Sequence, residues 1–238
     1  MPSQHVVIMG GSAGIGLATA KLLVDQDCRV TITGRNEQTL AQAKASLNSR
    51  VATVAADGAN ETEVRESFAQ IGSFDHLVLS FGSRKGAGPF ASLSLSDVRQ
   101  GFEEKVFPHV ACAQAALPHL RKDGSITFVS AVSAHGAFPG TAGLGAANAA
   151  VAALAPILAS ELRPLRVNAV SPGVIDTPWW DFLPADQRTA VFADFAGKTP
   201  AGRVGRAEDV ARAIAFLISD SFMTGHVLVC DGGLRLGA

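Results

Sequence analysis

Seven short apolar runs, many of them β-branched, alternate with longer helical patterns along the chain, and this alternation constrains the fold more than any other feature. Strands that alternate with helices are joined by right-handed crossovers and form parallel sheets. We therefore predict an α/β fold, a doubly wound, mainly parallel seven-stranded sheet with helices on both faces. The predicted strands are His5–Met9, Arg29–Thr33, Val51–Ala55, His76–Ser80, Ser125–Ser130, Leu165–Val170 and His226–Cys230.

Residue types that cap helices mark where the helical patterns begin. Asn36, Asn60, Ser96 and the pair Ala207–Glu208 can satisfy the free N–H groups of a first turn. The longest pattern covers residues 143–162, is rich in alanine and glycine, and is expected to end before Pro164. Its small side chains permit close helix packing, either against the sheet of the same chain or against a second subunit.

Length and charge limit the kinds of protein this chain can be. With 238 residues and 47% hydrophobic content, one α/β domain over residues 1–238 is expected. The 20 Lys and Arg residues nearly balance the 21 Asp and Glu residues and form no basic or acidic run. Nucleic acid and membrane surfaces are therefore not expected as partners, and a small molecule fits better.

The three cysteines and the N-terminus indicate the compartment. Cys28, Cys112 and Cys230 are widely spaced and form no C-x-x-C pair, so we predict reduced thiols and no metal site. The chain begins MPSQ without a basic leader, and no apolar stretch reaches the roughly 18 residues of a membrane span. We expect a soluble, cytoplasmic protein.

A glycine-rich segment follows the first predicted strand and opens the first predicted helix. It reads Met9-Gly10-Gly11-Ser12-Ala13-Gly14-Ile15-Gly16. Glycines there allow a tight turn and bring a pyrophosphate against the N–H groups of the helix, as in dinucleotide-binding Rossmann folds. Glycines at such a turn also serve strand-to-helix packing alone, which is the alternative interpretation.

The spacing Gly10-x-x-x-Gly14-x-Gly16 resembles the T-G-x-x-x-G-x-G loop of the short-chain dehydrogenase/reductase family. The similarity extends almost from end to end, through segments that match family motifs in the same order. It implies an oxidoreductase that binds a nicotinamide dinucleotide and assembles as a homo-oligomer, a dimer or a tetramer. The further matching segments are 171–177, 202–205, 208–211 and 231–233.

The resemblance also predicts which cofactor binds and where. Family members that use NAD commonly carry an acid after the second strand, where this chain has Gly34 followed by Arg35. A guanidinium suits a 2′-phosphate, so we expect NADP(H) to be preferred over NAD(H); an exposed loop arginine is the alternative. The predicted cofactor-binding residues are Gly10, Ser12, Gly14, Ile15, Gly16, Arg35, Asn36, Asp57, Gly82, Pro172, Gly173, Ile175 and Thr177.

The chain contains no tyrosine, although the family's chemistry centres on a Tyr-x-x-x-Lys pair. Alignment to the family places Leu144 at the tyrosine and Asn148 at the lysine. The family's assisting serine falls on Ala131, and its assisting asparagine falls on Lys105. The resemblance therefore implies a divergent member in which all four catalytic positions, 105, 131, 144 and 148, are replaced. Of the family's N-N-A-G motif, only Gly82 remains.

Three residues are candidates for the missing proton chemistry. Lys105 is expected on a helix that faces the pocket, His135 in a loop at its border, and Ser133 close to the aligned serine position. Each has a plain structural alternative: a lysine that reaches solvent, an exposed loop histidine, and a serine that satisfies a turn. Ser130 becomes a candidate if the alignment slips by one residue.

Residues 177–200 occupy the place of the family's variable substrate lid. Aromatic side chains at 179, 180, 182, 192 and 195 would form an apolar cover, which favours an apolar substrate; packing on the same domain is the alternative. Three hypotheses follow. The first is an NADP(H)-dependent oxidoreductase of a carbonyl, imine or activated alkene without the usual tyrosine, and the second is a non-catalytic NADP(H)-binding redox sensor or partner subunit. The third, for which no residue gives a positive signal, is a lyase or isomerase that uses the cleft without net redox change.

Overall fold

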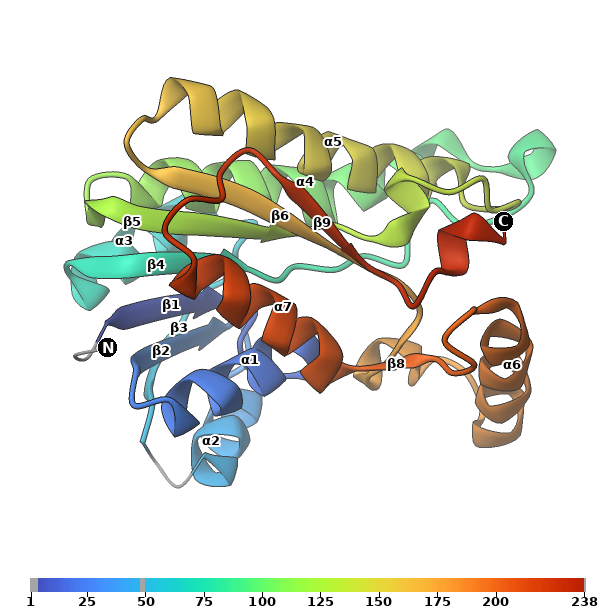
Figure 1. Cartoon of the computed structure of the whole chain (residues 1–238), viewed down its shortest axis with the longest axis horizontal. Coiled ribbons are helices and arrows are strands. Elements are labelled where there is room, and N and C mark those ends of the chain that lie inside the picture. Colours follow the sequence, from blue (N-terminus) through green and yellow to red (C-terminus); the bar gives the residue numbers. More distant parts are fainter. Residues whose placement is uncertain (1–3, 48–49, 238) are drawn as a thin grey trace.

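The computed structural model describes residues 4–47 and 50–237, and its centre is a parallel sheet of seven strands (Figure 1). The sheet order is β3-β2-β1-β4-β5-β6-β9, and every pairing is parallel. The predicted fold class is confirmed. The strands are β1 (His5–Met9), β2 (Arg29–Gly34), β3 (Ala52–Ala55), β4 (Phe74–Leu79), β5 (Leu120–Val129), β6 (Arg166–Pro172) and β9 (Val227–Cys230).

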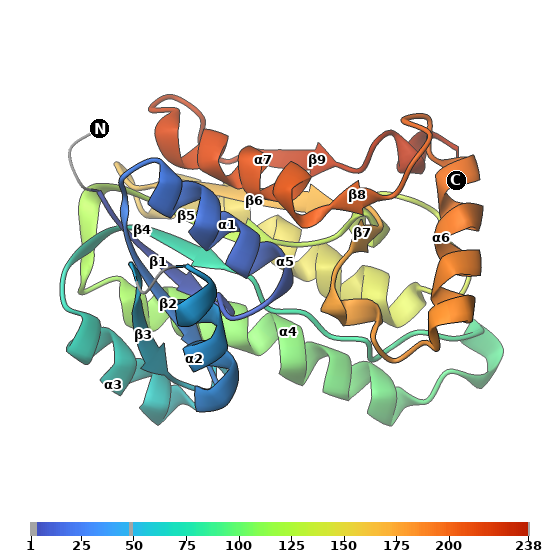
Figure 2. The same ribbon diagram turned by 90° about the horizontal axis from the view of Figure 1, so that it is seen from below.

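Helices cover both faces of the sheet, as the alternating pattern requires (Figure 1; Figure 2). One face carries α1 (Gly14–Asp25), α2 (Glu37–Ser46) and α7 (Ala207–Ser219), and the other carries α3 (Glu61–Ile71), α4 (Leu95–Ala116) and α5 (Ala142–Glu161). Each layer has its own apolar core. Val7 and Leu77 point into one core, whereas their neighbours Val6 and Val78 point into the other, as the two-residue period of a strand requires.

Side-chain caps fix the starts of three helices. Asn36 accepts a hydrogen bond from the N–H of Thr39 at 2.9 Å, and Asn60 accepts one from Thr62 at 3.1 Å. The cap of α4 is Ser94, whose hydroxyl accepts from the N–H of Ser96 at 3.2 Å. The predicted start at Ser96 is therefore wrong by two residues, because Ser94 supplies the accepting oxygen and Ser96 already lies in the first turn.

Helix α5 corrects the expectation that no apolar stretch is long enough to cross a membrane. It has 20 residues and a mean hydropathy of 1.7 over an 18-residue window, which passes that test by length and composition. In the fold, however, α5 packs on the sheet, and Val151 and Ala155 are completely buried. Small apolar residues allow one face of α5 to lie close to β5, β6 and α4, and 39% of the apolar window is buried.

Two short strands and one helix beyond the carboxyl edge of the sheet were not predicted. Strands β7 (Ile175–Asp176) and β8 (Gly205–Arg206) form a separate two-stranded parallel sheet. Between them, α6 (Ala185–Lys198) stands clear of the main sheet (Figure 1). The pairing of β7 with β8 holds the two ends of residues 177–204 next to each other, so this segment forms a loop anchored at its base.

Candidate functional site

The strand order of the main sheet reverses between β1 and β4. From β1 the chain proceeds outward to β2 and β3, whereas β4 begins the series β5, β6 and β9 on the other side. The loops after β1 and β4 therefore leave toward opposite faces and open a crevice at the carboxyl ends of these strands. Doubly wound sheets bind their ligands at this position.

The glycine loop after β1 is packed so tightly that side chains are excluded. Gly10 has φ +78°, and a Cβ there would lie 2.6 Å from the carbonyl oxygen of Ser80. A Cβ at Gly16 would lie 2.2 Å from the carbonyl oxygen of Gly10. The N–H of Gly11 donates to the carbonyl of Thr33 at 2.9 Å and so fixes the loop to β2. Packing alone accounts for these glycines.

The first turn of α1 has a second property that packing does not explain. Its N-cap is Ala13, which cannot cap with a side chain, and no acidic residue lies in the turn. The turn therefore has neither a capping oxygen nor a neighbouring negative charge, although the N-terminus of a helix carries a partial positive charge. This arrangement suits an anionic ligand such as a pyrophosphate.

The end of β2 lies beside the glycine loop. A Cβ at Gly34 would lie 2.9 Å from Ser12 Oγ, so the glycine leaves room for that hydroxyl. Arg35 and Asn36 follow and are exposed; Asn36 caps α2, and no ion pair of Arg35 occurs among the described residues. Asp57, after β3, is half-buried and accepts from the N–H of Ala59 at 3.1 Å. Glycine-loop and β2-end residues are thus side by side.

Lys105 on α4 is buried and its ammonium lies at the carboxyl ends of β4 and β5. Its Nζ donates to the carbonyl oxygens of Phe81 at 3.2 Å and Ser130 at 3.4 Å. No carboxylate of a described residue lies within ion-pair distance. Burial lowers the pKa of Lys105 to about 8, because the charged form loses its hydration. A buried cation without an anion is costly and is a feature of functional sites.

Asn148 on α5 lies close to two serines that follow β5. Its Nδ2 donates to Ser133 Oγ at 3.0 Å and to the carbonyl oxygen of Leu144 at 2.9 Å. Ser130 Oγ donates to the main-chain oxygen of Asn148 at 2.7 Å. The structure thus brings Asn148, Ser130 and Ser133 together, and the carbonyl of Ser130 joins them to Lys105.

The other sequence candidates lie nearby but make fewer contacts. Ala131 and Leu144 are half-buried and offer only apolar side chains. His135 is exposed at the end of a short 3₁₀ helix (Val132–Ala134), and no side-chain hydrogen bond to it occurs among the described residues. Of the three proposed proton-handling residues, the structure therefore buries Lys105, orients Ser133 and leaves His135 in solvent.

The segment that follows β7 reaches back across the crevice. Trp179 Nε1 donates to the carbonyl of Ser83 at 3.3 Å, and its ring lies close enough that a Cβ at Gly82 would be 3.5 Å away. Thr177 lies at Gly14, where a Cβ would be 3.5 Å from the threonine Cβ. Gly82, Gly14 and Thr177 are all predicted cofactor residues, and this segment contacts the loops that carry them.

The aromatic residues of the segment form one cluster. The Trp180 ring contacts Trp179 at a centroid distance of 4.7 Å, Phe192 at 5.6 Å and Phe182 at 6.0 Å. Arg188 on α6 holds this cluster to the base by hydrogen bonds to Asp176, to Asp181 and to the carbonyl of Thr177. The aromatic side chains predicted to form a cover therefore contact one another, and the cover itself stays a prediction.

The loop after β6 is in close contact with the C-terminal segment. The N–H of Gly173 donates to the carbonyl of Cys230 at 3.0 Å, and a Cβ at Gly173 would lie 2.8 Å from the Cα of Asp231. Pro172 and Ile175 beside it are buried. The Pro172-Gly173 turn is therefore held in place by a backbone that only glycine can approach.

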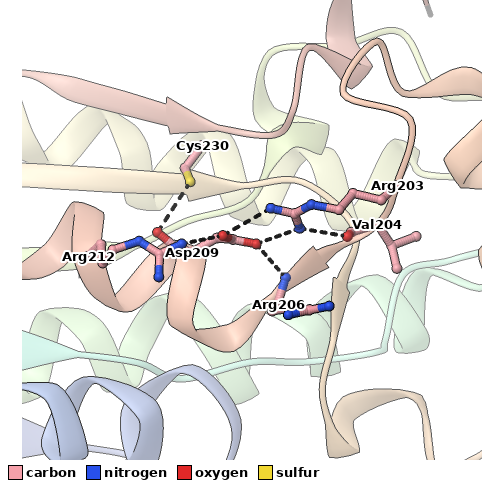
Figure 3. A network of polar contacts seen from close by, with 6 residues as sticks. All are labelled: Arg203, Val204, Arg206, Asp209, Arg212 and Cys230. Carbon is pink, nitrogen blue, oxygen red and sulfur yellow. Dashed lines mark hydrogen bonds and ion pairs between the residues drawn. The ribbon is translucent and has the colours of Figure 1, made fainter.

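A polar network that sequence reasoning missed anchors the far end of the aromatic segment (Figure 3). The carboxylate of Asp209 accepts from Arg203 at 2.7 and 3.1 Å, from the N–H of Arg206 at 2.8 Å and from Arg212 at 2.5 Å. The Arg203 guanidinium holds the pKa of Asp209 at about 2. The network fixes β8 to the start of α7, beside a cavity of about 280 Å³ that Cys230 and Asp231 also line.

Comparison with known proteins identifies relatives over the full length of the fold. The family described as Enoyl-(Acyl carrier protein) reductase matches residues 10–235. Cis-4-hydroxycyclohexanecarboxylate dehydrogenase of Sinomonas cyclohexanicum is 35% identical over 240 residues, which cover 95% of this chain and 94% of that enzyme. A small-chain dehydrogenase in complex with NADPH has a TM-score of 0.86 and 32% identity, covering 98% of this chain and 99% of the other.

A further solved structure concerns a protein altered at a tyrosine. It is a tyrosine-to-phenylalanine variant of ElxO with NADPH bound. It is 27% identical to this chain, has a TM-score of 0.87 and covers 98% of both chains. That variant retains NADPH although one of its tyrosines lacks the hydroxyl.

Proposed function

The chain belongs to the short-chain dehydrogenase/reductase family, and from that premise we propose that it is an NADP(H)-dependent oxidoreductase with a non-standard active site. The observation that carries the proposal is the uncapped first turn of α1 behind a glycine loop that excludes side chains. A pyrophosphate would fill this place, because it supplies the negative charge and the acceptors that the turn lacks.

NADP(H) is the proposed cofactor, in preference to NAD(H). Gly34 leaves no carboxylate at the end of β2, Arg35 is exposed there without an ion pair among the described residues, and Ser12 Oγ lies against Gly34. A guanidinium and a hydroxyl suit a 2′-phosphate, whereas an acid would repel it. Two solved neighbours contain NADPH, which supports the binding of NADP(H).

The remaining cofactor contacts are proposed for the loops that meet at the crevice. Gly10, Gly14, Ile15 and Gly16 would hold the pyrophosphate, and Asn36 and Asp57 the adenosine. Gly82, Pro172, Gly173, Ile175 and Thr177 would border the nicotinamide, which supplies or accepts the hydride when bound. Their support is the packing of Thr177 against Gly14 and the fixed turn at Gly173.

Lys105 is the proposed proton donor in place of a tyrosine. Its ammonium lies at the carboxyl ends of β4 and β5, has carbonyl acceptors only, and has a pKa of about 8. A group that titrates near neutral pH can give its proton to a carbonyl oxygen as a hydride adds to the carbon, and can recover it from solvent. His135 is a weaker candidate because it is exposed.

The substrate class follows from the aromatic cluster. Residues 177–200 are proposed as a lid that excludes water from a small, apolar carbonyl, imine or activated alkene. The cis-4-hydroxycyclohexanecarboxylate dehydrogenase is named for a six-membered hydrocarbon ring that carries a hydroxyl and a carboxylate, and the ring of such a substrate would suit this lid. We further propose a cytoplasmic homo-oligomer of the one-domain chain, to be tested by light scattering.

The alternative function is a non-catalytic NADP(H)-binding protein, a redox sensor or a partner subunit. The observation that favours it is the complete absence of tyrosine together with Ala131, Leu144 and Asn148 at the aligned catalytic positions. In that case the crevice would bind the nucleotide, and Lys105 would serve another purpose than proton transfer.

The experiment that separates these functions has two parts. Calorimetric titration should show that NADPH binds more tightly than NADH. Arg35→Ala should lower the affinity for NADPH by roughly 10- to 100-fold, which corresponds to the free energy of hydrogen bonds to a charged group. Arg99→Ala removes an exposed arginine from α4 and serves as the matched control. Equal binding of both nucleotides would contradict the cofactor assignment.

The second part measures turnover. NADPH oxidation with a panel of apolar carbonyls should be detectable, and Lys105→Met should lower kcat by on the order of 10²–10⁴, the contribution of a positioned acid. His135→Ala should have little effect. NADPH binding without turnover of any carbonyl, imine or activated alkene would instead favour the non-catalytic alternative.

A further inference from the structure

The side-chain amide of Asn148 has only one orientation that fits its neighbours. Its Nδ2 lies 2.9 Å from the carbonyl oxygen of Leu144 and 3.0 Å from Ser133 Oγ. A carbonyl oxygen only accepts hydrogen bonds, so an inverted amide would set two oxygens against each other. The nitrogen therefore faces both groups, and one of its N–H groups donates to Ser133 Oγ.

This donation determines what the hydroxyl of Ser133 can do. Because Oγ already accepts from Asn148, its own hydrogen points elsewhere, and no acceptor for it occurs among the described residues. Ser133 is half-buried, directly after β5 at the carboxyl edge of the sheet. The neighbouring Ser130 differs, since its hydroxyl donates to the main-chain oxygen of Asn148.

Asn148 also keeps an unpaired acceptor. Its Oδ1 is buried and has no hydrogen-bond partner among the described residues. An unsatisfied buried amide oxygen lowers stability, so the packing of α5 alone gives no reason for an amide at this position. The orientation of Ser133 is the positive effect that this amide has.

We propose that Asn148 is a positioning residue that holds the Ser133 hydroxyl as a hydrogen-bond donor to the substrate oxygen. Lys105 lies near this group, since its Nζ donates to the carbonyl oxygen of Ser130, whose hydroxyl donates to the main-chain oxygen of Asn148. A hydroxyl that donates to this oxygen would stabilise the negative charge that develops there during hydride addition. This inference rests on the proposed oxidoreductase function and adds the group that polarises the substrate.

The test uses benzamide, an apolar carboxamide whose oxygen accepts hydrogen bonds but is not reduced. Its affinity for the protein–NADP⁺ complex is measured by calorimetry. Ser133→Ala should weaken the binding of benzamide roughly fivefold, the loss of one hydrogen bond of average strength, and leave the affinity for NADP⁺ unchanged. Ser67→Ala is the matched control, because the Ser67 hydroxyl is also buried but donates to the carbonyl of Val64 on α3.

Asn148→Asp tests the positioning role. A carboxylate cannot donate, so the Ser133 hydroxyl would turn and donate to it instead of to the ligand. Asn148→Asp alone should lose as much benzamide affinity as Ser133→Ala. The variant that combines both substitutions should lose no more affinity than either single variant. If the double variant instead lost benzamide affinity by the product of the two single losses, the two residues would act independently, and the proposed coupling would be overturned.

Three further outcomes are decisive. Unchanged benzamide affinity in Ser133→Ala, with NADP⁺ bound normally, would overturn this inference and leave the proposed function standing. No binding of NADP⁺ to the unaltered protein would overturn both. If Asn148→Asp does not fold, Ser133→Thr takes its place: it keeps the hydroxyl and should restore most of the affinity that Ser133→Ala loses, whereas a loss equal to alanine would refute the donor role.

Discussion

At the scale of single residues, Lys105 is the side chain whose position says most about function. A lysine on a helix commonly extends its ammonium to water, but this one is directed inward to two carbonyl oxygens. The charge is retained without a carboxylate among the described residues. Such a group destabilises the fold while it is charged, which is expected where a site is maintained for chemistry.

The cost of that charge should appear as a pH dependence of stability. The folded-state pKa of about 8 lies below the ordinary lysine pKa of 10.5, so the unfolded chain binds more protons between these pH values. The free energy of unfolding contributed by Lys105 should therefore rise from pH 8 to 10.5, by about 3 kcal/mol at most. Urea denaturation should show this rise relative to Lys105→Met, in which it is absent. Parallel curves for both proteins would contradict the burial of a charged amine.

At the scale of elements, the segment from β7 to β8 is held by its ends more than by a core. No residue of α6 is buried. Arg188 donates to Asp176, Asp181 and the carbonyl of Thr177 at one end of the segment, and the Asp209 carboxylate accepts from Arg203 and from the N–H of Arg206 at the other. An element fixed in this way can open as a unit, because few apolar contacts are lost.

Arg188→Met should loosen this element without unfolding the protein. The substitution keeps an apolar stem but removes the hydrogen bonds to the base. Amide exchange in residues 176–198 should become faster by several-fold, while the thermal transition of the whole chain moves little. Lys198→Met, which removes a pair between neighbours within α6, is the control. Uniform acceleration throughout the sheet would show that Arg188 serves global stability instead.

At the scale of the whole molecule, two buried histidines must stay neutral, His76 on β4 of the central sheet and His109 on α4. Burial lowers the pKa of His76 to about 4, and that of His109 to about 3. His76 Nδ1 lies 2.8 Å from Ser125 Oγ, and its buried Nε2 has no hydrogen-bond partner among the residues that the structure describes. Protonation of either ring requires that the interior open to water.

The folded chain should therefore lose stability at pH values well above those at which carboxylates titrate. Because the pKa of His76 is lower in the folded state than in the unfolded chain, its contribution to the free energy of unfolding is fully present above pH 6.5. That contribution is lost as the pH falls toward 4. The loss is about 3 kcal/mol for this group. Urea midpoints between pH 7 and 4 should fall steeply, and less so in His76→Gln. The exposed His135→Gln should behave like the unaltered protein.

The main sheet was predictable because each of its strands is long enough to show a pattern. The seven runs gave the strands to within a few residues, although β5 begins five residues before the predicted start at Ser125. Strands β7 and β8 were not predictable, since two residues have no period and their pairing depends on distant contacts. Likewise, sequence placed Lys105 on the correct helix, but whether its ammonium turned inward depended on packing.

The aromatic cluster over the crevice has an optical consequence. The chain has two tryptophans and no tyrosine, and both tryptophans, Trp179 and Trp180, lie in the segment that crosses the loops after β1 and β4. The near-ultraviolet fluorescence of this protein therefore comes almost entirely from these two adjacent tryptophans. Reduced nicotinamides absorb where tryptophan emits, so the natural chain is its own fluorescent probe for nucleotide arrival and for movement of that segment, without any label.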